Sequence, residues 1–316
     1  MTSAWYSTEC HRLWRGREDP EENGDTRRWH QVMQPCNEKS VPGHALLGLS
    51  CDAGVARNQG RAGARQGPGA LRGQLANLAY HLDAPLFDAG DIVCDGDALE
   101  DAQALFAQRV ASLLDQGHRV IGLGGGHEIA FASFSGLLRQ RLQSSALPRL
   151  GILNLDAHLD LRQAARPSSG TPFRQCAEHC AEHQVGFHYT CLGVSRSGNT
   201  RALFDRAHQL GVDWVMDEDC LDECTGVVQE AVDRLLAKVD AVYLTVCLDA
   251  LPAYVAPGVS APSARGISLR LVEDVIDYVR ARVELPVCDV AELNPERDID
   301  QRTARVGARI VERLAR

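Results

Sequence analysis

Short apolar runs alternate with longer amphipathic segments along the chain from about residue 45 onward. The apolar runs are nearly continuous, and several are rich in leucine or β-branched residues, as in strands that are buried on both faces of a sheet. They predict strands at Ala45–Cys51, Arg119–Leu123, Leu150–Leu155, Tyr189–Val194, Trp214–Met216, Ala241–Leu248 and Val287–Ala291. The segments between them have the apolar spacing of helices, at about 68–80, 99–115, 127–144, 200–210, 222–238, 269–282 and 301–315.

Strands and helices in alternation predict an α/β fold, a three-layer α/β/α arrangement in which helices cover both faces of a mostly parallel sheet. Residues 1–40 differ, because Arg, Asp, Glu and Trp are mixed there without a regular period. We expect residues 1–40 to form an N-terminal arm that is partly ordered by packing on the body. No internal repeat, low-complexity linker or break in composition follows residue 45, so we expect residues 41–316 to form a single domain.

The composition of the 316 residues is that of an ordinary globular chain, with 45% apolar and 24% charged residues. The net charge of −9 and the lack of Lys/Arg runs argue against a nucleic-acid-binding surface. No stretch approaches the roughly 18 apolar residues that a membrane-spanning helix needs, and the first residues lack the apolar segment of a secretory signal. We therefore expect a cytoplasmic protein that does not bind membranes, with its 11 scattered cysteines present as free thiols.

Polar clusters follow three of the predicted strands, at the carboxyl ends where the active groups of such sheets gather. The first is Gly-Gly-Gly-His-Glu at 124–128. Glycines allow the backbone to turn tightly and to approach a ligand closely, and His127 is well placed to bind a metal. The motif lacks the Gly-Lys-Ser/Thr ending of a phosphate-binding loop. The alternative is a histidine that caps the helix or packs in the core.

The second cluster is Asn-Leu-Asp-Ala-His-Leu-Asp at 154–160. In an extended segment Asp156, His158 and Asp160 point the same way, and two carboxylates with one imidazole suit Mn²⁺, Fe²⁺ or Zn²⁺. The alternative is an Asp-rich loop that caps a helix. The third cluster follows the strand Ala241–Leu248, which delivers Cys247 and Asp249 to the same side. A buried carboxylate there needs a partner, because an unpaired buried charge is costly.

Together the three clusters provide a set of candidate metal ligands: His127, Asp156, His158, Asp160, Cys247 and Asp249. Six ligands are too many for one open catalytic metal, but they suit two neighbouring ions. Two such ions lower the pKa of a shared water until it can attack an electrophilic carbon.

These clusters resemble the motifs of the ureohydrolases, the arginase and agmatinase superfamily, over about residues 42–312. The resemblance rests on Gly-Gly-His at 125–127, Asp-Ala-His-Leu-Asp at 156–160 and Leu-Asp…Ala-Pro-Gly at 248–258. Further segments are similar to the formimidoylglutamases, which act in one route of histidine degradation: Asn-Gln-Gly-Arg at 58–61, Gly-Pro at 67–68, Gly-His-Glu-Ile-Ala at 126–130 and Leu-Pro-Ala…Ala-Pro-Gly-Val-Ser-Ala-Pro at 251–262. Asp-Val-Ala-Glu-Leu-Asn-Pro at 289–295 resembles the closing motif, in which a glutamate, here Glu292, faces the amidine or guanidine group.

The resemblance implies an arginase-like fold, two Mn²⁺ ions per subunit and a homo-oligomer. It implies hydrolysis of a small dicarboxylate, N-formimidoyl-L-glutamate, to L-glutamate and formamide, with Asp160 relaying a proton and Glu292 pairing with the amidinium. The substrate carboxylates need cationic or amide donors, and arginine binds carboxylate with two parallel hydrogen bonds. The candidates for this role are Arg162, Arg196 and Asn199.

The chain departs from the superfamily pattern in two places. Cys247 stands where an aspartate usually bridges the two metals, and a thiolate favours Zn²⁺ over Mn²⁺. The loop after Asp160 has no histidine before His179, whereas arginases keep a proton-shuttling histidine there. Two alternatives therefore stay open: a guanidino-acid or agmatine-type ureohydrolase that releases urea, and a catalytically weak arginase-fold protein that binds a metabolite.

Overall fold

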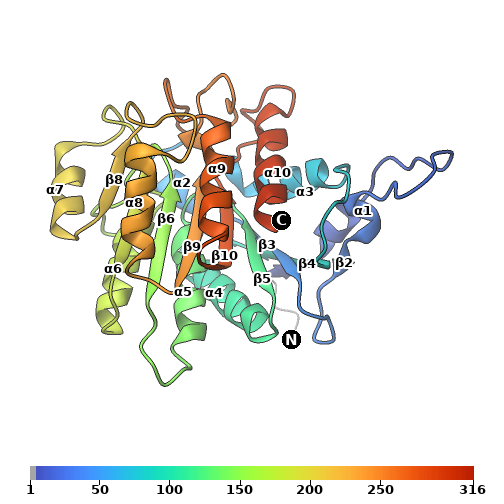
Figure 1. The fold of residues 1–316 in the computed structure, drawn as a ribbon, viewed down its shortest axis with the longest axis horizontal. Coiled ribbons are helices and arrows are strands. Elements are labelled where there is room, and N and C mark those ends of the chain that lie inside the picture. Colours follow the sequence, from blue (N-terminus) through green and yellow to red (C-terminus); the bar gives the residue numbers. More distant parts are fainter. Residues whose placement is uncertain (1–4) are drawn as a thin grey trace.

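A sheet of ten strands forms the centre of the computed structural model, which describes residues 5–316. The strand order is β1-β4-β3-β5-β10-β9-β6-β7-β8, and β2 pairs with β4 outside this path (Figure 1). Within these residues the paired strands run parallel, except that β1 is antiparallel to β4. The strands are β1 (Tyr6–Ser7), β2 (Gln34–Pro35), β3 (His44–Ser50), β4 (Leu86–Val93), β5 (Arg119–Leu123), β6 (Leu150–Leu155), β7 (His188–Val194), β8 (Asp213–Met216), β9 (Ala241–Cys247) and β10 (Glu284–Ala291).

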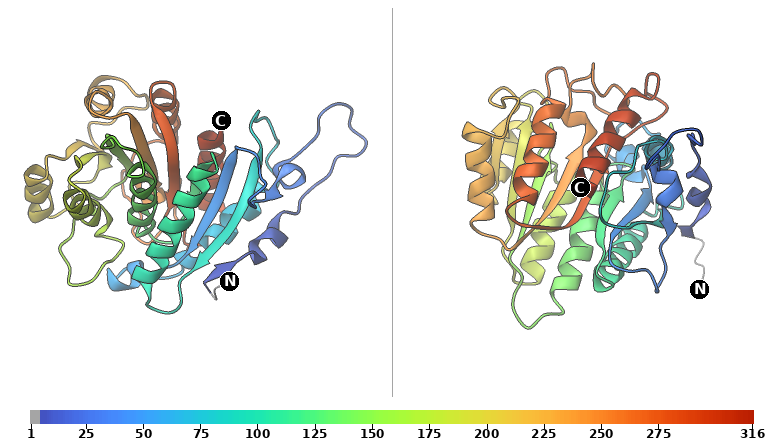
Figure 2. Two further views of the ribbon diagram at one scale, coloured as in Figure 1. Left: turned by 90° about the horizontal axis from the view of Figure 1, so that it is seen from below. Right: turned by 45° about the vertical axis from the view of Figure 1, so that its right-hand side comes forward.

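Helices cover both faces of the sheet, as two further directions of view make clear (Figure 2). The helices are α1 (Trp29–Val32), α2 (Ala53–Arg57), α3 (Gly67–Leu75), α4 (Leu99–Asp115), α5 (Ile129–Arg141), α6 (Pro172–Glu182), α7 (Arg201–Gln209), α8 (Gly226–Leu236), α9 (Leu269–Arg280) and α10 (Arg302–Ala315), with short 3-10 helices η1 (Glu9–Leu13), η2 (Ala64–Gln66) and η3 (Leu248–Ala250). α3, α8, α9 and α10 bury their apolar residues in one core, and α4, α5, α6 and α7 in the other. The three layers confirm the predicted α/β/α fold. None of the helices in this part of the chain is long and apolar enough to cross a membrane.

The predicted strands are all present, with ends that shift by at most three residues. The prediction missed β4, because Asp88, Gly90 and Asp91 interrupt its apolar pattern. It also missed β1 and β2, which are two residues long, and α6, where polar residues are interspersed among the apolar ones. Several predicted helices are shorter than expected; the helix at 68–80, for example, ends at Leu75.

Arg72 of α3 makes the acidic strand β4 compatible with burial. Its guanidinium group donates to both oxygens of Asp88 at 2.9 Å and to Asp91 Oδ1 at 2.6 Å. All three side chains are buried. Burial alone would raise the pKa of Asp88, but the Arg72 charge outweighs this effect and holds the pKa below its ordinary value. The fold thus depends on an ion pair between two elements that the sequence pattern does not link.

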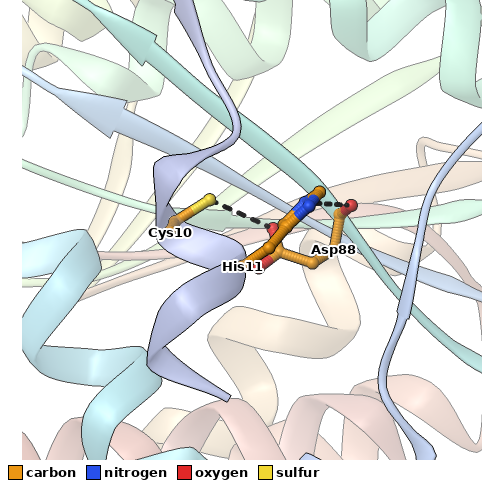
Figure 3. Close-up of side chains that lie close together, drawn as sticks. All are labelled: Cys10, His11 and Asp88. Atoms are coloured by element: carbon orange, nitrogen blue, oxygen red, sulfur yellow. Dashed lines mark hydrogen bonds between the residues drawn. The ribbon is translucent and has the colours of Figure 1, made fainter.

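The same carboxylate anchors the N-terminal arm, whose strands β1 and β2 lie along the outer edge of β4. Trp14 Nε1 donates to Asp88 Oδ2 at 2.6 Å. Cys10 Sγ lies 3.9 Å from Asp88 Oδ1 (Figure 3). The His11 ring meets the main-chain oxygen of Asp88 at 3.2 Å. Cys10, His11 and Asp88 are close enough to form a metal site, but Arg72 already neutralises Asp88. We therefore interpret the group as a hydrogen-bonded anchor.

His44 begins β3 and is buried, and burial together with Arg119 and Arg280 lowers its pKa to about 4. A histidine in an unfolded chain titrates near 6.5, so between pH 6.5 and 4 the unfolded chain binds a proton that the folded chain does not. The free energy of unfolding therefore does not change with the titration of His44 above about pH 6.5. It decreases by up to about 3 kcal/mol as the pH falls toward 4. We expect His44→Gln to remove this slope from the free energy of unfolding, measured by denaturant titration across the range. The exposed His81 is the control, and His81→Gln should leave the slope intact.

Candidate metal centre

Four adjacent central strands, β5, β10, β9 and β6, bring the three predicted clusters together at one edge of the sheet. A cavity of about 300 Å³ lies there, and five of the six predicted ligands line it: His127, His158, Asp160, Cys247 and Asp249. The sixth, Asp156, is 0% exposed and contacts the two histidines from beneath the cavity lining.

The predicted ligands form two triads that share Asp156. In one triad, His127, Asp156 and Cys247 bring their ligand atoms within 4.8 Å of one another, and Asp156, His158 and Asp249 do so in the other. Asp156 Oδ2 lies 2.8 Å from His127 Nδ1, whereas Oδ1 of the same carboxylate lies 3.4 Å from His158 Nδ1. One carboxylate therefore presents one oxygen to each triad, as expected for a group between two cations.

Asp160 and Asp249 complete the two halves of the centre. Asp160 Oδ2 lies 3.1 Å from His127 Nδ1, and Asp249 Oδ2 lies 3.2 Å from His158 Nδ1. The backbone of Asp160 has a φ of 48°, in the left-handed region that non-glycine residues seldom adopt. Such conformations persist where the surrounding structure over-determines them, and they cluster at functional sites.

The donor set fits divalent cations on chemical grounds. Asp249 Oδ1 and Glu292 Oε2 are buried, and neither has a hydrogen-bond partner among residues 5–316. Acidic side chains also outnumber the imidazoles in this space, and an unpaired buried charge is costly. Cations bound by the two triads would give the buried polar atoms partners and would compensate the negative charge. Carboxylate oxygens with imidazole nitrogens are ligands that suit Mn²⁺.

Without such cations the two histidines hold the pKa of Asp156 below its ordinary value, whereas other acids of the site resist ionisation. Burial and the neighbouring Asp156 raise the pKa of Asp160 to about 6. Burial, Asp249 and Glu128 raise the pKa of Glu292 to about 8. Burial also raises the pKa of the Cys247 thiol well above its ordinary value, and Asp156 and Asp249 add to the effect. A pair of cations would reverse this balance and favour the ionised forms.

Glu292 extends the centre from the end of β10. Its carboxylate Oε1 accepts a hydrogen bond from the backbone N–H of His127 at 2.9 Å, and its own backbone φ is 72°.

The glycines before His127 also have a different role from the one expected from sequence. A Cβ at Gly125 would lie 1.7 Å from the carbonyl oxygen of Cys51, so this glycine permits close approach to the end of β3 rather than to a ligand.

A hydroxyl behind His127 orients its ring. Nε2 of His127 lies 3.1 Å from Thr245 Oγ1. Because Nδ1 faces the other ligands and would bind the metal unprotonated, the ring proton lies on Nε2, which donates it to the threonine hydroxyl. Thr245 is the register partner of Asp289 on β10. The fully buried Asp289 carboxylate accepts hydrogen bonds of 2.6 Å from Ser133 Oγ and from Tyr243 Oη. Partners of this kind hold a metal-binding histidine in the right tautomer and orientation.

We expect Thr245→Val to lower Mn²⁺ affinity by about tenfold or more, because the shape of the side chain is kept while the acceptor for His127 is lost. Equilibrium dialysis with metal analysis measures this effect independently of activity. Ser133→Ala is the matched control, since it removes a hydrogen bond to Asp289 without touching His127. Equal losses of affinity in both variants would show that the effect is general loosening of the core.

The substrate-side predictions have different outcomes. Arg162 lines the cavity, and no hydrogen bond or ion pair within residues 5–316 engages its guanidinium group. Arg196 is absent from the cavity lining; its side chain is 74% exposed and pairs with Glu218 at 3.4 Å. Asn199 lines the cavity, but its amide bonds the backbone of Leu159, Ala157 and Ser195 at 2.8–3.0 Å. It therefore positions the metal-ligand loop, and its role as a substrate donor stays a prediction.

Other lining residues were not among the predicted site residues. Arg61 lines the cavity, and its Nε and Nη2 donate to the carbonyl oxygens of Ser260 and Val259. Ser169 lines it as well, and its hydroxyl accepts from Asn58 Nδ2 at 3.2 Å. The Asn-Gln-Gly-Arg segment at 58–61 was a sequence signal for part of this wall, whereas nothing local marked Ser169.

Comparison with known proteins places these features in context. The family model described as "Arginase family" matches residues 43–315. The formimidoylglutamase of Ralstonia nicotianae is 54% identical over 305 residues, which cover 96% of this chain and 94% of that protein. The crystal structure of formimidoylglutamase from Bacillus subtilis has a TM-score of 0.81 at 19% identity and covers 93% of this chain and 92% of its own. A variant of Trypanosoma cruzi formiminoglutamase solved with Mn²⁺ has a TM-score of 0.79 at 25% identity, covering 92% and 98%.

Proposed function

This chain belongs to the arginase family, and on that premise we propose that it is a binuclear manganese hydrolase that converts N-formimidoyl-L-glutamate and water into L-glutamate and formamide. The observation that carries the proposal is the Asp156 carboxylate, which faces one histidine with each of its oxygens. The name of the 54% identical relative supports the substrate. A manganese requirement, a place in histidine degradation and self-association belong to the same proposal.

The residues divide into two metal-holding groups. His127, Asp156, Asp160 and Cys247 would hold one ion, and Asp156, His158 and Asp249 the other. When bound, the two ions would supply Lewis acidity that lowers the pKa of the attacking water. Asp160 accepts a hydrogen bond from the attacking water, takes its proton and passes it to the amine that leaves with glutamate.

Glu292 and Arg162 orient the substrate. Glu292 Oε1 is held by the His127 N–H, while Oε2 has no partner among residues 5–316. That oxygen is free to pair with the amidinium and to place its carbon over the water. Arg162 stands on the cavity wall with an unengaged guanidinium, which can bind a substrate carboxylate in two-point fashion.

The test is product formation by the purified protein in the presence of Mn²⁺. We would offer N-formimidoyl-L-glutamate, agmatine, guanidinobutyrate and arginine in parallel, and measure formamide, urea and free amine. Glutamate and formamide from the first compound alone are the expected products. Urea from a guanidino compound would overturn the proposal in favour of a urea-releasing ureohydrolase.

The non-catalytic alternative depends on Cys247, whose thiol belongs to the His127 triad and not to the His158 triad. Cys247→Asp discriminates between the two readings. If the natural chain is an enzyme, the unaltered chain and Cys247→Asp are both active, and the substitution changes only the preference between Mn²⁺ and Zn²⁺. Activity that arises only in Cys247→Asp, after silence of the unaltered chain with Mn²⁺, Zn²⁺ and Co²⁺, would mean that the natural chain is a binding protein.

A further inference from the structure

A second cavity, of about 540 Å³, adjoins the metal-centre cavity and shares Asn58, Arg162 and Leu203 with it. We call it the arginine pocket, because its lining contains Arg57, Arg162, Arg166 and Arg206 but no aspartate or glutamate. The whole chain has a net charge of −9, so this local excess of cations is opposite in sign to the average surface. Clefts lined by one sign of charge concentrate ligands of the other sign.

Two of the four arginines are neutralised from outside the pocket. Arg57 pairs with Asp97 at 2.7 Å and with Glu100 at 2.9 Å, and Arg166 pairs with Asp97 at 2.6 Å. These two acids therefore account for two of the positive charges and leave the other two without a counter-charge.

Arg162 and Arg206 are those two uncompensated cations. Arg206 of α7 donates to the carbonyl oxygen of Leu161 at 2.7 Å and to Gln163 Oε1 at 3.3 Å, and both acceptors are neutral. The backbone of Arg162 is held on both sides, by Gly170 O at 2.9 Å and Arg174 Nε at 2.9 Å. Its stem is thus positioned while its guanidinium stays free, at the boundary between the two cavities.

We propose that the arginine pocket binds a carboxylate, namely the carboxylate of a dicarboxylic substrate that lies farther from the hydrolysed bond. This inference rests on the proposed function for its substrate, because N-formimidoyl-L-glutamate has one carboxylate beside the reacting nitrogen and a second at the end of its side chain. A guanidinium pair without acids matches that second charge. A free dicarboxylate would present the same chemistry, and the experiment separates the two sources.

The experiment compares N-formimidoyl-L-glutamate with N-formimidoyl-L-glutamine, which has nearly the same shape and a neutral end. In Arg206→Gln we expect KM for the glutamate compound to rise about tenfold, the size of one charged hydrogen bond. kcat for both compounds and KM for the glutamine compound should stay within about twofold, since only the charged end loses a partner. Arg206→Lys should recover part of the loss. Arg201→Gln on the same helix is the control, because Arg201 lies outside the pocket lining.

Glutarate binding to the Mn²⁺-bound protein, measured by calorimetry, provides a readout that does not depend on turnover. The expected result is weaker binding in Arg206→Gln than in the unaltered chain or in Arg201→Gln. If neither formimidoyl compound is hydrolysed but glutarate shows this pattern, the proposed function fails and the anion site stands. Identical glutarate binding in all variants overturns the site. If Arg206→Gln weakens glutarate binding but leaves KM for the formimidoyl substrate unchanged, the pocket binds a free dicarboxylate and not the substrate. If Arg206→Gln lowers kcat equally for both compounds, Arg206 only supports the Leu161 segment.

Discussion

Asp156→Asn should remove both metal ions at once and lower kcat/KM by more than about a thousandfold, since each ion contributes several kcal/mol to catalysis. The reason is geometric: the two oxygens of this one carboxylate face His127 and His158 separately. An asparagine keeps the shape but presents an amide N–H₂ to one of the two triads, and that group repels a cation.

The measurement is the number of Mn²⁺ ions per chain, together with the stabilisation that Mn²⁺ confers. A site held at a hundred to a thousand times its Kd stabilises the fold by about 3 to 4 kcal/mol, so the unaltered chain should unfold at a lower temperature in chelator. Asp156→Asn should lose most of this difference. Asp217→Asn is the matched control, because Asp217 is a buried aspartate that follows strand β8, which β7 separates from β6. Two ions bound to Asp156→Asn would contradict the shared carboxylate.

Glu292→Gln should lower kcat/KM for the amidine by roughly 30-fold to several thousandfold, which corresponds to the about 2 to 5 kcal/mol lost when a buried charge pair is broken. Glutamine can still accept the hydrogen bond from the His127 N–H, so the metal ligands should stay in place. What is lost is the negative charge beside the cationic substrate.

Steady-state kinetics with a parallel count of bound Mn²⁺ tests this expectation, because the variant should keep both ions. Glu296→Gln, in the same loop but exposed and bonded to Gln66, should retain full activity. An unchanged kcat/KM in Glu292→Gln would remove Glu292 from substrate recognition. Loss of the ions would instead make it a support for His127.

The strands and helices that the sequence predicted correctly were identified from the spacing of apolar residues, which is a local property. β9 and β6 are uninterrupted apolar runs and were readily predicted. β4 was not predicted, because its two aspartates are compatible with a buried strand only when Arg72 of α3 neutralises them. That ion pair joins two elements whose residues lie 16 and 19 positions apart, and no local pattern reveals it.

The clustering of the candidate ligands could be expected for a similar reason. Each lies just beyond an apolar run, and the carboxyl ends of parallel strands meet at one edge of a sheet. The substrate-side residues were harder to place from sequence, because the direction of a long arginine side chain depends on its tertiary neighbours. Arg196 turns outward to Glu218, while Arg162 stays on the cavity wall.

Local chemistry along the chain was therefore sufficient for the α/β class and for the polar clusters at the strand ends, since strand burial depends on residue type and near spacing. The choice of metal ligands among these clusters stays a prediction. Three features depended on the tertiary structure. The order β5-β10-β9-β6 makes neighbours of strands that are distant in sequence. The packing of these strands turns the two oxygens of Asp156 toward different histidines. The approach of α7 to the loop after Asp160 brings Arg206 beside Arg162 in one pocket. Such contacts arise from packing between distant segments, which the residue pattern within any one segment does not specify.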